Sequence, residues 1–305
     1  MAPPQPIPQF PHFLPLALEH RPVNQPLLWQ YQPTTSELTF TNLFLWQGHY
    51  NFSWCLWEHW FIALAQPAEG QPWLLPPVGP PGRGPLCRQL LDWLGTTLGV
   101  AAPSIERADR RVAMEVAAEP DIHCEPCREH FDYLYRTRDL IDLPGNKYHS
   151  KRNHLNKLRR STPCRYEPLR AELLPACLSL AERWCEFKRC ADDLNLMGEW
   201  EAIRLGLQYF QELELTGGVI LIRDHVEAFS LGELLNATTA VIHFEKANPE
   251  QSELYTLINQ QFCQQAWGAT AYLNREQDLG EPGLRRAKES YHPVRLEEKF
   301  RLTLK

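Results

Sequence analysis

Residues 269–293 bring together many of the side chains in this sequence that are suited to chemistry. An apolar run at 271–273 is long enough for one buried strand. A polar group follows it at once, namely Asn274, Arg275, Glu276, Gln277 and Asp278. Glycine and proline then break the chain before a basic segment with Arg285, Arg286 and Lys288. Because open α/β sheets bind ligands at the carboxyl ends of their strands, this pattern is suited to a site, although a solvated loop with internal ion pairs fits it equally.

A second candidate group, Glu245 and Lys246, comes just after a predicted strand at 239–244. A carboxylate at a strand end can accept a proton from an attacking amine or hydroxyl. It can also simply pair with Lys246 or Arg275, and the spacing leaves both open. Residues 248–251 then lead into a helix N-terminus, whose free N–H groups suit an anion. The segment lacks the glycines that would admit a pyrophosphate, which counts against coenzyme A.

A basic helix is predicted at 147–160, where six Lys and Arg residues occur without an acid. Its cationic candidates for binding phosphate are Lys147, Lys151, Arg152, Arg159 and Arg160. Most charge runs are solvated helix surfaces. Here the mutual repulsion of the cations favours an anionic partner, such as the phosphates of a nucleotide or of RNA.

Composition limits the class of protein. The 305 residues carry a formal net charge of −6, which argues against indiscriminate binding to nucleic acid. No apolar run approaches the ~18 residues that span a bilayer, and no signal sequence precedes the domains, so we expect a cytoplasmic protein. Nine irregularly spaced cysteines indicate free thiols, and the His123-Cys124-Cys127-His130 group lacks the second ligand pair of a zinc site, so no metal is expected.

Apolar periodicity and chain breaks predict a flexible proline-rich arm at 1–25, a first domain at 26–140 and a second at 141–305. The first contains an aromatic stretch at 42–60, read as strands, a helix at 86–98 and a strand at 131–135. The second reads as three helices (147–160, one begun by Pro175, and 199–213), a hairpin, a strand, a helix at 250–267 and a last strand. Asn146 is expected to cap the basic helix, and Phe187 to face inward. This order predicts a mixed α+β sheet.

Several blocks also carry a resemblance. NLFLWQGHY, DYLYRTRDLIDLPGNKYHSKRNHLNKLRR, GGVILIRDHVEAFSLGELL, VIHFEKANPE, YLNREQDLGEPGLRRAKESYHP and VRLEEKF are similar to an uncharacterised bacterial family related to the C-terminal domain of phosphatidylglycerol lysyltransferase. The similarity runs from about residue 42 to the C-terminus. It implies two tandem GCN5-related N-acyltransferase-like domains, as in the Fem aminoacyltransferases, each a mixed and mostly antiparallel sheet with flanking helices.

The resemblance also implies an activity, since relatives with known chemistry move an aminoacyl group from tRNA to a lipid or peptidoglycan acceptor. We therefore expect direct transfer from aminoacyl-tRNA to an amine or hydroxyl of a small molecule or lipid head group. The alternatives are an acyl-coenzyme A donor and a non-catalytic RNA- or anion-binding module. Glu245, Glu276 and Lys288 are the predicted catalytic residues. The predicted substrate-binding residues are Lys246, Asn274, Arg275, Asp278, Arg285 and Tyr291, of which Tyr291, like Lys288, is carried over from the family.

Overall fold

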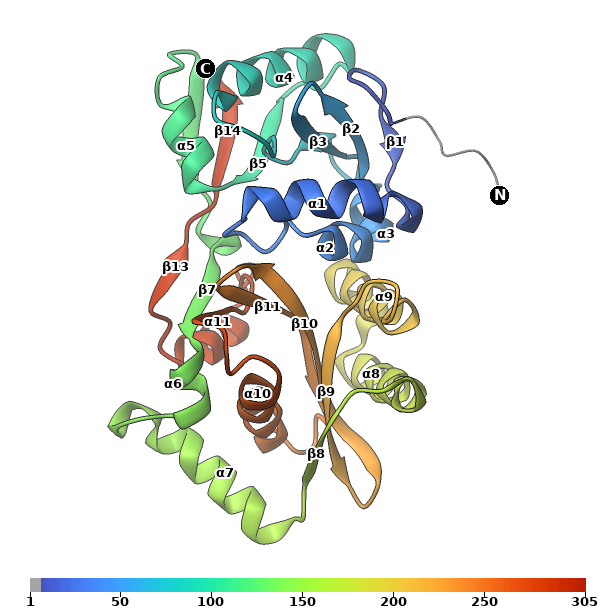
Figure 1. Cartoon of the computed structure of the whole chain (residues 1–305), viewed down its shortest axis with the longest axis vertical. Coiled ribbons are helices and arrows are strands. Elements are labelled where there is room, and N and C mark those ends of the chain that lie inside the picture. Colours follow the sequence, from blue (N-terminus) through green and yellow to red (C-terminus); the bar gives the residue numbers. More distant parts are fainter. Residues whose placement is uncertain (1–6) are drawn as a thin grey trace. The chain divides into compact units, whose positions relative to one another are not determined.

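The computed structural model describes residues 7–305, and the chain divides into two compact units (Figure 1). The first unit contains the residues up to Asp132 and Glu297–Lys305, and the second contains Tyr133–Leu296. This division differs from the predicted boundary at 140/141, because a strand expected to close the first domain pairs in the second sheet. The predicted arm is wrong for residues 7–25, which carry β1 (Leu14–Pro15), a 3-10 turn and the start of α1 (Arg21–Tyr31). Its first six residues lie outside the described residues.

The first unit is built on a seven-stranded sheet of order β1-β2-β3-β4-β5-β14-β6. Its further strands are β2 (Ser53–Trp57), β3 (Trp60–Ala65), β4 (Trp73–Leu74), β5 (Ser104–Ala108), β6 (Ile122–Pro126) and β14 (Phe300–Leu304). Its further helices are α2 (Phe40–Leu45), α3 (Gln47–Tyr50), α4 (Arg83–Thr97) and α5 (Arg110–Val116). The aromatic stretch is thus helical at its start, where the Thr39 hydroxyl caps α2 by accepting the Asn42 N–H, and forms strands only from Ser53.

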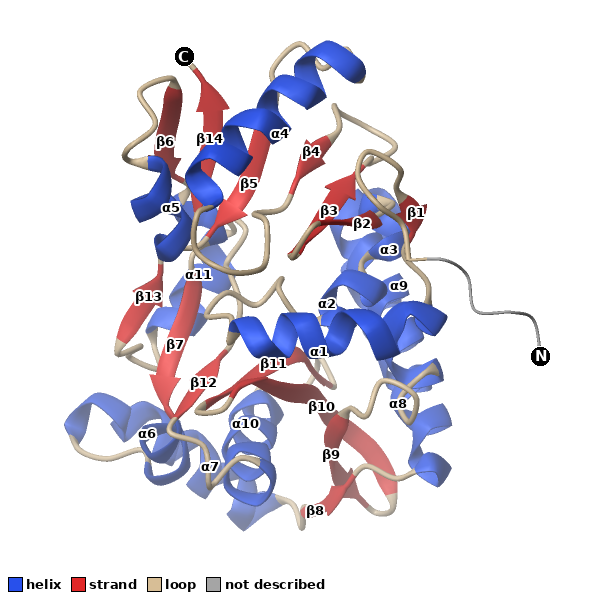
Figure 2. Ribbon diagram, turned by 45° about the horizontal axis from the view of Figure 1, so that its top comes forward, coloured by secondary structure: helices blue, strands red, loops and turns tan. Residues whose placement is uncertain are grey.

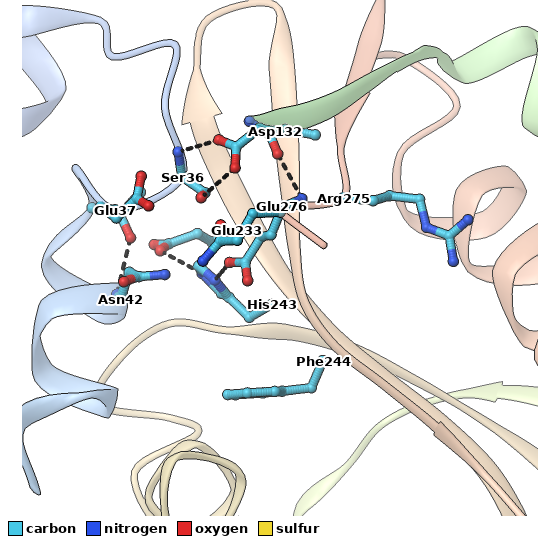
Figure 3. A network of polar contacts seen from close by, with 12 residues as sticks. Ser36, Glu37, Asn42, Asp132, Glu233, His243, Phe244, Arg275 and Glu276 are labelled. Carbon is cyan, nitrogen blue, oxygen red and sulfur yellow. Dashed lines mark hydrogen bonds and ion pairs between the residues drawn. The ribbon is translucent and has the colours of Figure 1, made fainter. Parts of the chain in front are cut away.

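A buried lysine ties the C-terminal segment to the first unit. Lys299 is completely buried, and its Nζ lies 2.6 Å from Asp132 Oδ1 and 2.7 Å from Glu37 Oε2. Asp132 also accepts hydrogen bonds from the N–H and hydroxyl of Ser36 (Figure 3). Because a buried ammonium is stable only when it is paired, these contacts explain why residues 297–305 return to the first sheet.

The second unit is built on a seven-stranded sheet of order β13-β7-β12-β11-β10-β9-β8 (Figure 2). Its strands are β7 (Asp132–Arg136), β8 (Arg165–Pro168), β9 (Thr216–Ile222), β10 (His225–Asn236), β11 (Thr239–Ala247), β12 (Tyr272–Asn274) and β13 (Arg295–Glu297). Its helices are α6 (Thr137–Asp142), α7 (His149–Ser161), α8 (Leu174–Lys188), α9 (Leu194–Gln208), α10 (Glu253–Ala266) and α11 (Pro282–Glu289). Figure 1 shows α10 on one side of the sheet and α8 and α9 on the other. The predicted α+β class, with mixed sheets and flanking helices, is confirmed.

The predicted helices of the second unit form with shifted ends. Pro175 lies in the first turn of α8, as predicted, whereas α9 begins five residues before Glu199, at Leu194, where the Asp193 side chain caps it. Asn146 does not cap the basic helix, because it lies in a 3-10 turn and Tyr148 occupies the cap position of α7. Phe187 is 61% exposed, so the inward prediction for it is wrong.

The cysteines differ in part from the prediction of free thiols. Cys185 and Cys190 are joined in a disulfide at the C-terminus of α8. Seven other cysteines are free, and burial raises the pKa of several of them, including Cys177 to about 12. In the described part of the chain, no helix is long and apolar enough to cross a membrane.

Candidate active site where two parallel strands part

The second sheet has a parallel strand pair whose members have different lengths. β11 pairs with β12 only from Thr239 opposite Tyr272 to Val241 opposite Asn274. β12 ends there, whereas β11 continues to Ala247. Glu245 and Lys246 therefore lie inside a strand, and the prediction that they follow it is wrong. The carboxyl end of such a pair is where α/β proteins commonly bind ligands.

A β-bulge at His243 sets the direction of the side chains beyond this point. Leu231 pairs with Phe244 and Gly232 pairs with Ile242, which leaves His243 as the extra residue on β11. Gly232 is required here, because a Cβ on it would lie 2.4 Å from the carbonyl oxygen of Val241. A bulge re-aims the side chains that follow it, and here Glu245 faces α10 while Lys246 faces α9.

Glu245 anchors a buried polar group. Its Oε1 accepts a hydrogen bond from Arg275 Nη2 at 3.0 Å, and its Oε2 accepts one from Asn259 Nδ2 at 3.1 Å. The Arg275 guanidinium lies over the ring of Tyr291 at 4.7 Å from the centroid, and Lys151 Nζ lies 3.9 Å from the same centroid. We call these five residues the Glu245 cluster. The cluster joins β11, α10, α7 and the segments that follow β12 and α11.

Burial gives the Glu245 cluster its electrostatic character. The side chains of Arg275 and Glu245 are 13% and 11% exposed. Burial alone lowers the pKa of Arg275, but the Glu245 carboxylate, together with Tyr135, Tyr291 and Cys263, holds that pKa above its ordinary value. Burial lowers the pKa of Lys151 to about 8, and the neighbouring Arg275 adds to the effect. Lys151 thus lies in the Glu245 cluster, and the phosphate-binding role predicted for it stays a prediction.

Glu276 lies in a different network from Glu245. Its Oε1 is 2.9 Å from His243 Nδ1, and His243 Nε2 is 3.0 Å from Glu233 Oε1. Figure 3 shows the side chain of Arg275 extending away from Glu276 and His243. Burial alone lowers the pKa of His243, but its hydrogen bonds with Glu233 and Glu276 raise it to about 9. The two predicted catalytic carboxylates, those of Glu245 and Glu276, therefore bind different side chains.

The remaining predicted residues of the 274–278 segment hold its backbone. Asn274 Oδ1 accepts the N–H of Glu276, and Lys288 Nζ donates to the carbonyl oxygens of Arg275 and Gln277. Asp278, which is completely buried, accepts two hydrogen bonds from Arg285 and one of 2.6 Å from the hydroxyl of Tyr133. Burial alone raises the pKa of Asp278, but Arg285 and Tyr133 hold it well below its usual range. These contacts fix the position of Arg275.

Lys246 lies apart from the Glu245 cluster. Its Nζ is 2.8 Å from Glu199 Oε1 and 3.4 Å from the centroid of the Trp184 ring. Lys246 is 4% exposed, and burial lowers its pKa. Lys246 therefore packs between β11 and the helices α8 and α9.

The cations of α7 have several partners. Arg152 donates to the carbonyl oxygens of Leu143 and Gly145, and Arg159 donates to Gln260. Lys157 Nζ lies 2.8 Å from Glu253 Oε1. Glu253 is distant in sequence, so counting the acids near the basic helix in the sequence could not identify it as a partner. Lys147 and Arg160 are exposed. Among the residues predicted to bind phosphate, these two exposed candidates lie near the two ends of the helix.

Sequence reasoning missed Asn259 and the His243 network. Asn259 is 2% exposed although it is polar, and its position three residues before Phe262, on the buried face of α10, was the available signal. His243 stood in an apolar strand sequence, VIHFEK, but the bulge that turns it toward two carboxylates leaves no mark in the sequence.

Two mixed sheets with flanking helices define the class of protein as one with a tandem acyltransferase-like fold. Residues 29–303 match the family model described as phosphatidylglycerol lysyltransferase, C-terminal. The chain belongs to this family, which confirms the predicted resemblance, and the family and the fold together support an acyltransferase.

Solved structures agree on the fold. A conserved protein of unknown function from Bacteroides thetaiotaomicron is 28% identical, with a TM-score of 0.88 over 96% of this chain and 99% of that one. The C-terminal domain of a protein described as a lysylphosphatidylglycerol synthetase from Agrobacterium fabrum is 12% identical, with a TM-score of 0.64 over 92% and 89%. L-PGS from Bacillus licheniformis is 13% identical, with a TM-score of 0.57 over 81% of each chain. No curated protein matches the sequence.

Proposed function

We propose that this protein is an aminoacyltransferase, which moves an aminoacyl group from tRNA to an amine or hydroxyl acceptor at the Glu245 cluster. The observation that carries the proposal is the buried contact between Glu245 and Arg275, beyond the point where β11 and β12 part. Family membership supports the reaction class, since the family is named for a lysyltransferase. The acceptor is a small molecule or a lipid head group.

The reaction needs no covalent enzyme intermediate, because the donor ester is already activated. The acceptor nitrogen or oxygen forms a bond to the acyl carbon, and the bond from that carbon to the ribose oxygen of the donor breaks. Glu245 takes the proton that the acceptor loses and passes it to the ribose oxygen as that oxygen leaves, which restores the carboxylate. Arg275 stabilises the negative charge that develops on the acyl oxygen, and its fixed position requires no reorganisation. Glu276, Lys288 and Asp278 act as positioning residues, through the backbone and side-chain contacts described above.

The donor phosphates bind to exposed cations within α7 and just before it. Lys147 and Arg160 are exposed near the two ends of this helix, and Arg159 is exposed beside Arg160. Recognition of RNA through phosphate is independent of sequence and weakens with salt. A donor bound in this way would dissociate as ionic strength rises.

A coenzyme A donor fits this structure less well. The loop between β11 and α10 has no glycine, and Asn248 donates to Glu227 and accepts the N–H of Glu250. Glu253 occupies the first turn of α10. A pyrophosphate at this helix N-terminus would therefore meet carboxylates where acyl-coenzyme A enzymes offer free N–H groups.

The test compares donors on the purified protein. It is incubated with tRNA carrying labelled amino acids or with labelled acetyl-coenzyme A, and with phosphatidylglycerol vesicles or small amines and alcohols as acceptors. We expect label to move from tRNA to an acceptor and none to move from coenzyme A. Transfer from acetyl-coenzyme A alone would establish the coenzyme A alternative. RNA binding that survives Glu245→Gln, without product from any donor, would instead establish a non-catalytic module.

A further inference from the structure

Two polar atoms of the Glu245 cluster are buried without a hydrogen-bond partner among the described residues. They are Nη1 of Arg275 and Oδ1 of Asn259. The orientation of the Asn259 amide is fixed, because the Glu245 carboxylate only accepts hydrogen bonds and must face the Nδ2 donor. A buried polar atom without a partner is destabilising, so a ligand that supplies the missing contacts is favoured here.

The two atoms specify what a guest must carry. Arg275 Nη1 is a donor and requires an acceptor, and a charged acceptor gives the stronger bond. Asn259 Oδ1 is an acceptor and requires an O–H or N–H. Both residues bind the same Glu245 carboxylate, one on each oxygen, which places both side chains around one group and favours a ligand whose acceptor and donor are close together.

The net charge of the Glu245 cluster determines which charge the ligand should carry. Two cations, Arg275 and Lys151, accompany one carboxylate, that of Glu245. Lys151 Nζ lies over the same Tyr291 ring as the Arg275 guanidinium, at 3.9 Å and 4.7 Å from its centroid. Two like charges against one ring face a repulsion that an anion relieves. Arg275 and Glu245 retain 13% and 11% exposure, so the cluster is not sealed from solvent.

We propose that Arg275, Lys151 and Asn259 form a binding site for a small ligand in which an anionic oxygen lies next to a hydroxyl or an ammonium group. Arg275 Nη1 and Lys151 hold the anion, and Asn259 Oδ1 accepts a hydrogen bond from the neighbouring group. Two sources share this chemistry, an amino acid and a hydroxyl-bearing phosphate ester. The proposal deepens the proposed function and rests on it for the role of the ligand as substrate, but binding is measured without any transfer.

The test titrates the full chain with ligands that differ in one feature, at constant ionic strength, and follows saturation by the shift in Tm. The ligands are acetate, glycolate, glycine, glycinamide and 2-hydroxyethyl phosphate. We expect glycolate or glycine to bind about tenfold more tightly than acetate, since only they supply the donor that Asn259 requires. Glycinamide, which lacks the anion, should not saturate. The tighter of glycine and 2-hydroxyethyl phosphate identifies the source.

Variants of α7 provide the control. Lys151→Met keeps the stem against Tyr291 and removes the charge, so anion affinity should fall about tenfold. Lys157→Met, which removes an exposed lysine of the same helix that pairs with Glu253, should leave affinity unchanged, and Lys151→Arg should restore it. Equal affinities of acetate and glycolate, equal effects of the two methionine variants, or no saturation by any anion would overturn the proposal. A failure of transfer with intact binding would refute the proposed function alone.

Discussion

Arg275 donates a hydrogen bond to Glu245 at 3.0 Å from a position just past the end of β12, whereas Glu245 lies within β11, four residues beyond the last paired residue, Val241. The pair therefore bridges two strands that have stopped bonding to each other. Both side chains are largely buried, so the contact acts in a low dielectric. Its charge and position make it the centre of the proposed chemistry.

Removal of one partner of this pair should destabilise the second unit. Arg275→Met leaves the Glu245 carboxylate buried with only Asn259 as its hydrogen-bond donor, and breaking a buried ion pair costs about 3–5 kcal/mol. Urea unfolding followed by circular dichroism measures the loss. Arg160→Met, which removes an exposed arginine, is the control and should change stability by less than about 0.5 kcal/mol. Equal stability of the two variants would show that the pair is not formed.

The His243 network should make stability fall in alkaline solution. The pKa of His243 is raised from 6.5 to about 9, so its stabilising effect is complete below pH 6.5 and is lost as pH rises through 9. Linkage gives a contribution of about 3 kcal/mol. The measurement is the free energy of unfolding from pH 6 to 10, for the wild type and for His243→Gln. A difference between them that does not change with pH would contradict a protonated His243 between Glu233 and Glu276.

The bulge should tolerate no side chain at Gly232. Gly232→Ala places a Cβ 2.4 Å from the backbone oxygen of Val241, and the forced shift should cost about 1–3 kcal/mol. Gly283→Ala is the matched control, because that glycine lies in α11 with nothing within 4 Å of the added Cβ. The control should be neutral or stabilising by up to about 1 kcal/mol. Thermal unfolding compares the two, and an unaffected Gly232→Ala protein would exclude this bulge geometry.

Sequence patterns predicted the element types of the second unit because its apolar residues repeat with the periods of helices and strands. They failed where tertiary contacts decide. Polar Glu245 and Lys246 suggested that the strand had ended at Phe244, but partners on two different helices keep both in β11. β7 ends the first half in sequence and yet pairs with β12.

Several residues of the candidate site were predicted from the sequence, but most contacts between them were not. Arg275 and Glu245 were both expected near a strand end, with an ion pair as one alternative. Lys151 was grouped with phosphate ligands, because a helical repeat cannot show which cation packs on Tyr291. Asn259 was missed, because one amide within an apolar helix face carries no charge pattern.

The most direct test of the central claim measures single-turnover transfer from aminoacyl-tRNA by the Glu245→Gln protein. Glutamine keeps the size of the side chain and removes the proton acceptor, so the account predicts a rate at least about 100-fold below the wild type. Glu199→Gln, which changes the carboxylate paired with Lys246 on the opposite face of β11, should retain the wild-type rate. A Glu245→Gln protein that transfers as fast as the Glu199→Gln protein would contradict the assignment of chemistry to this site.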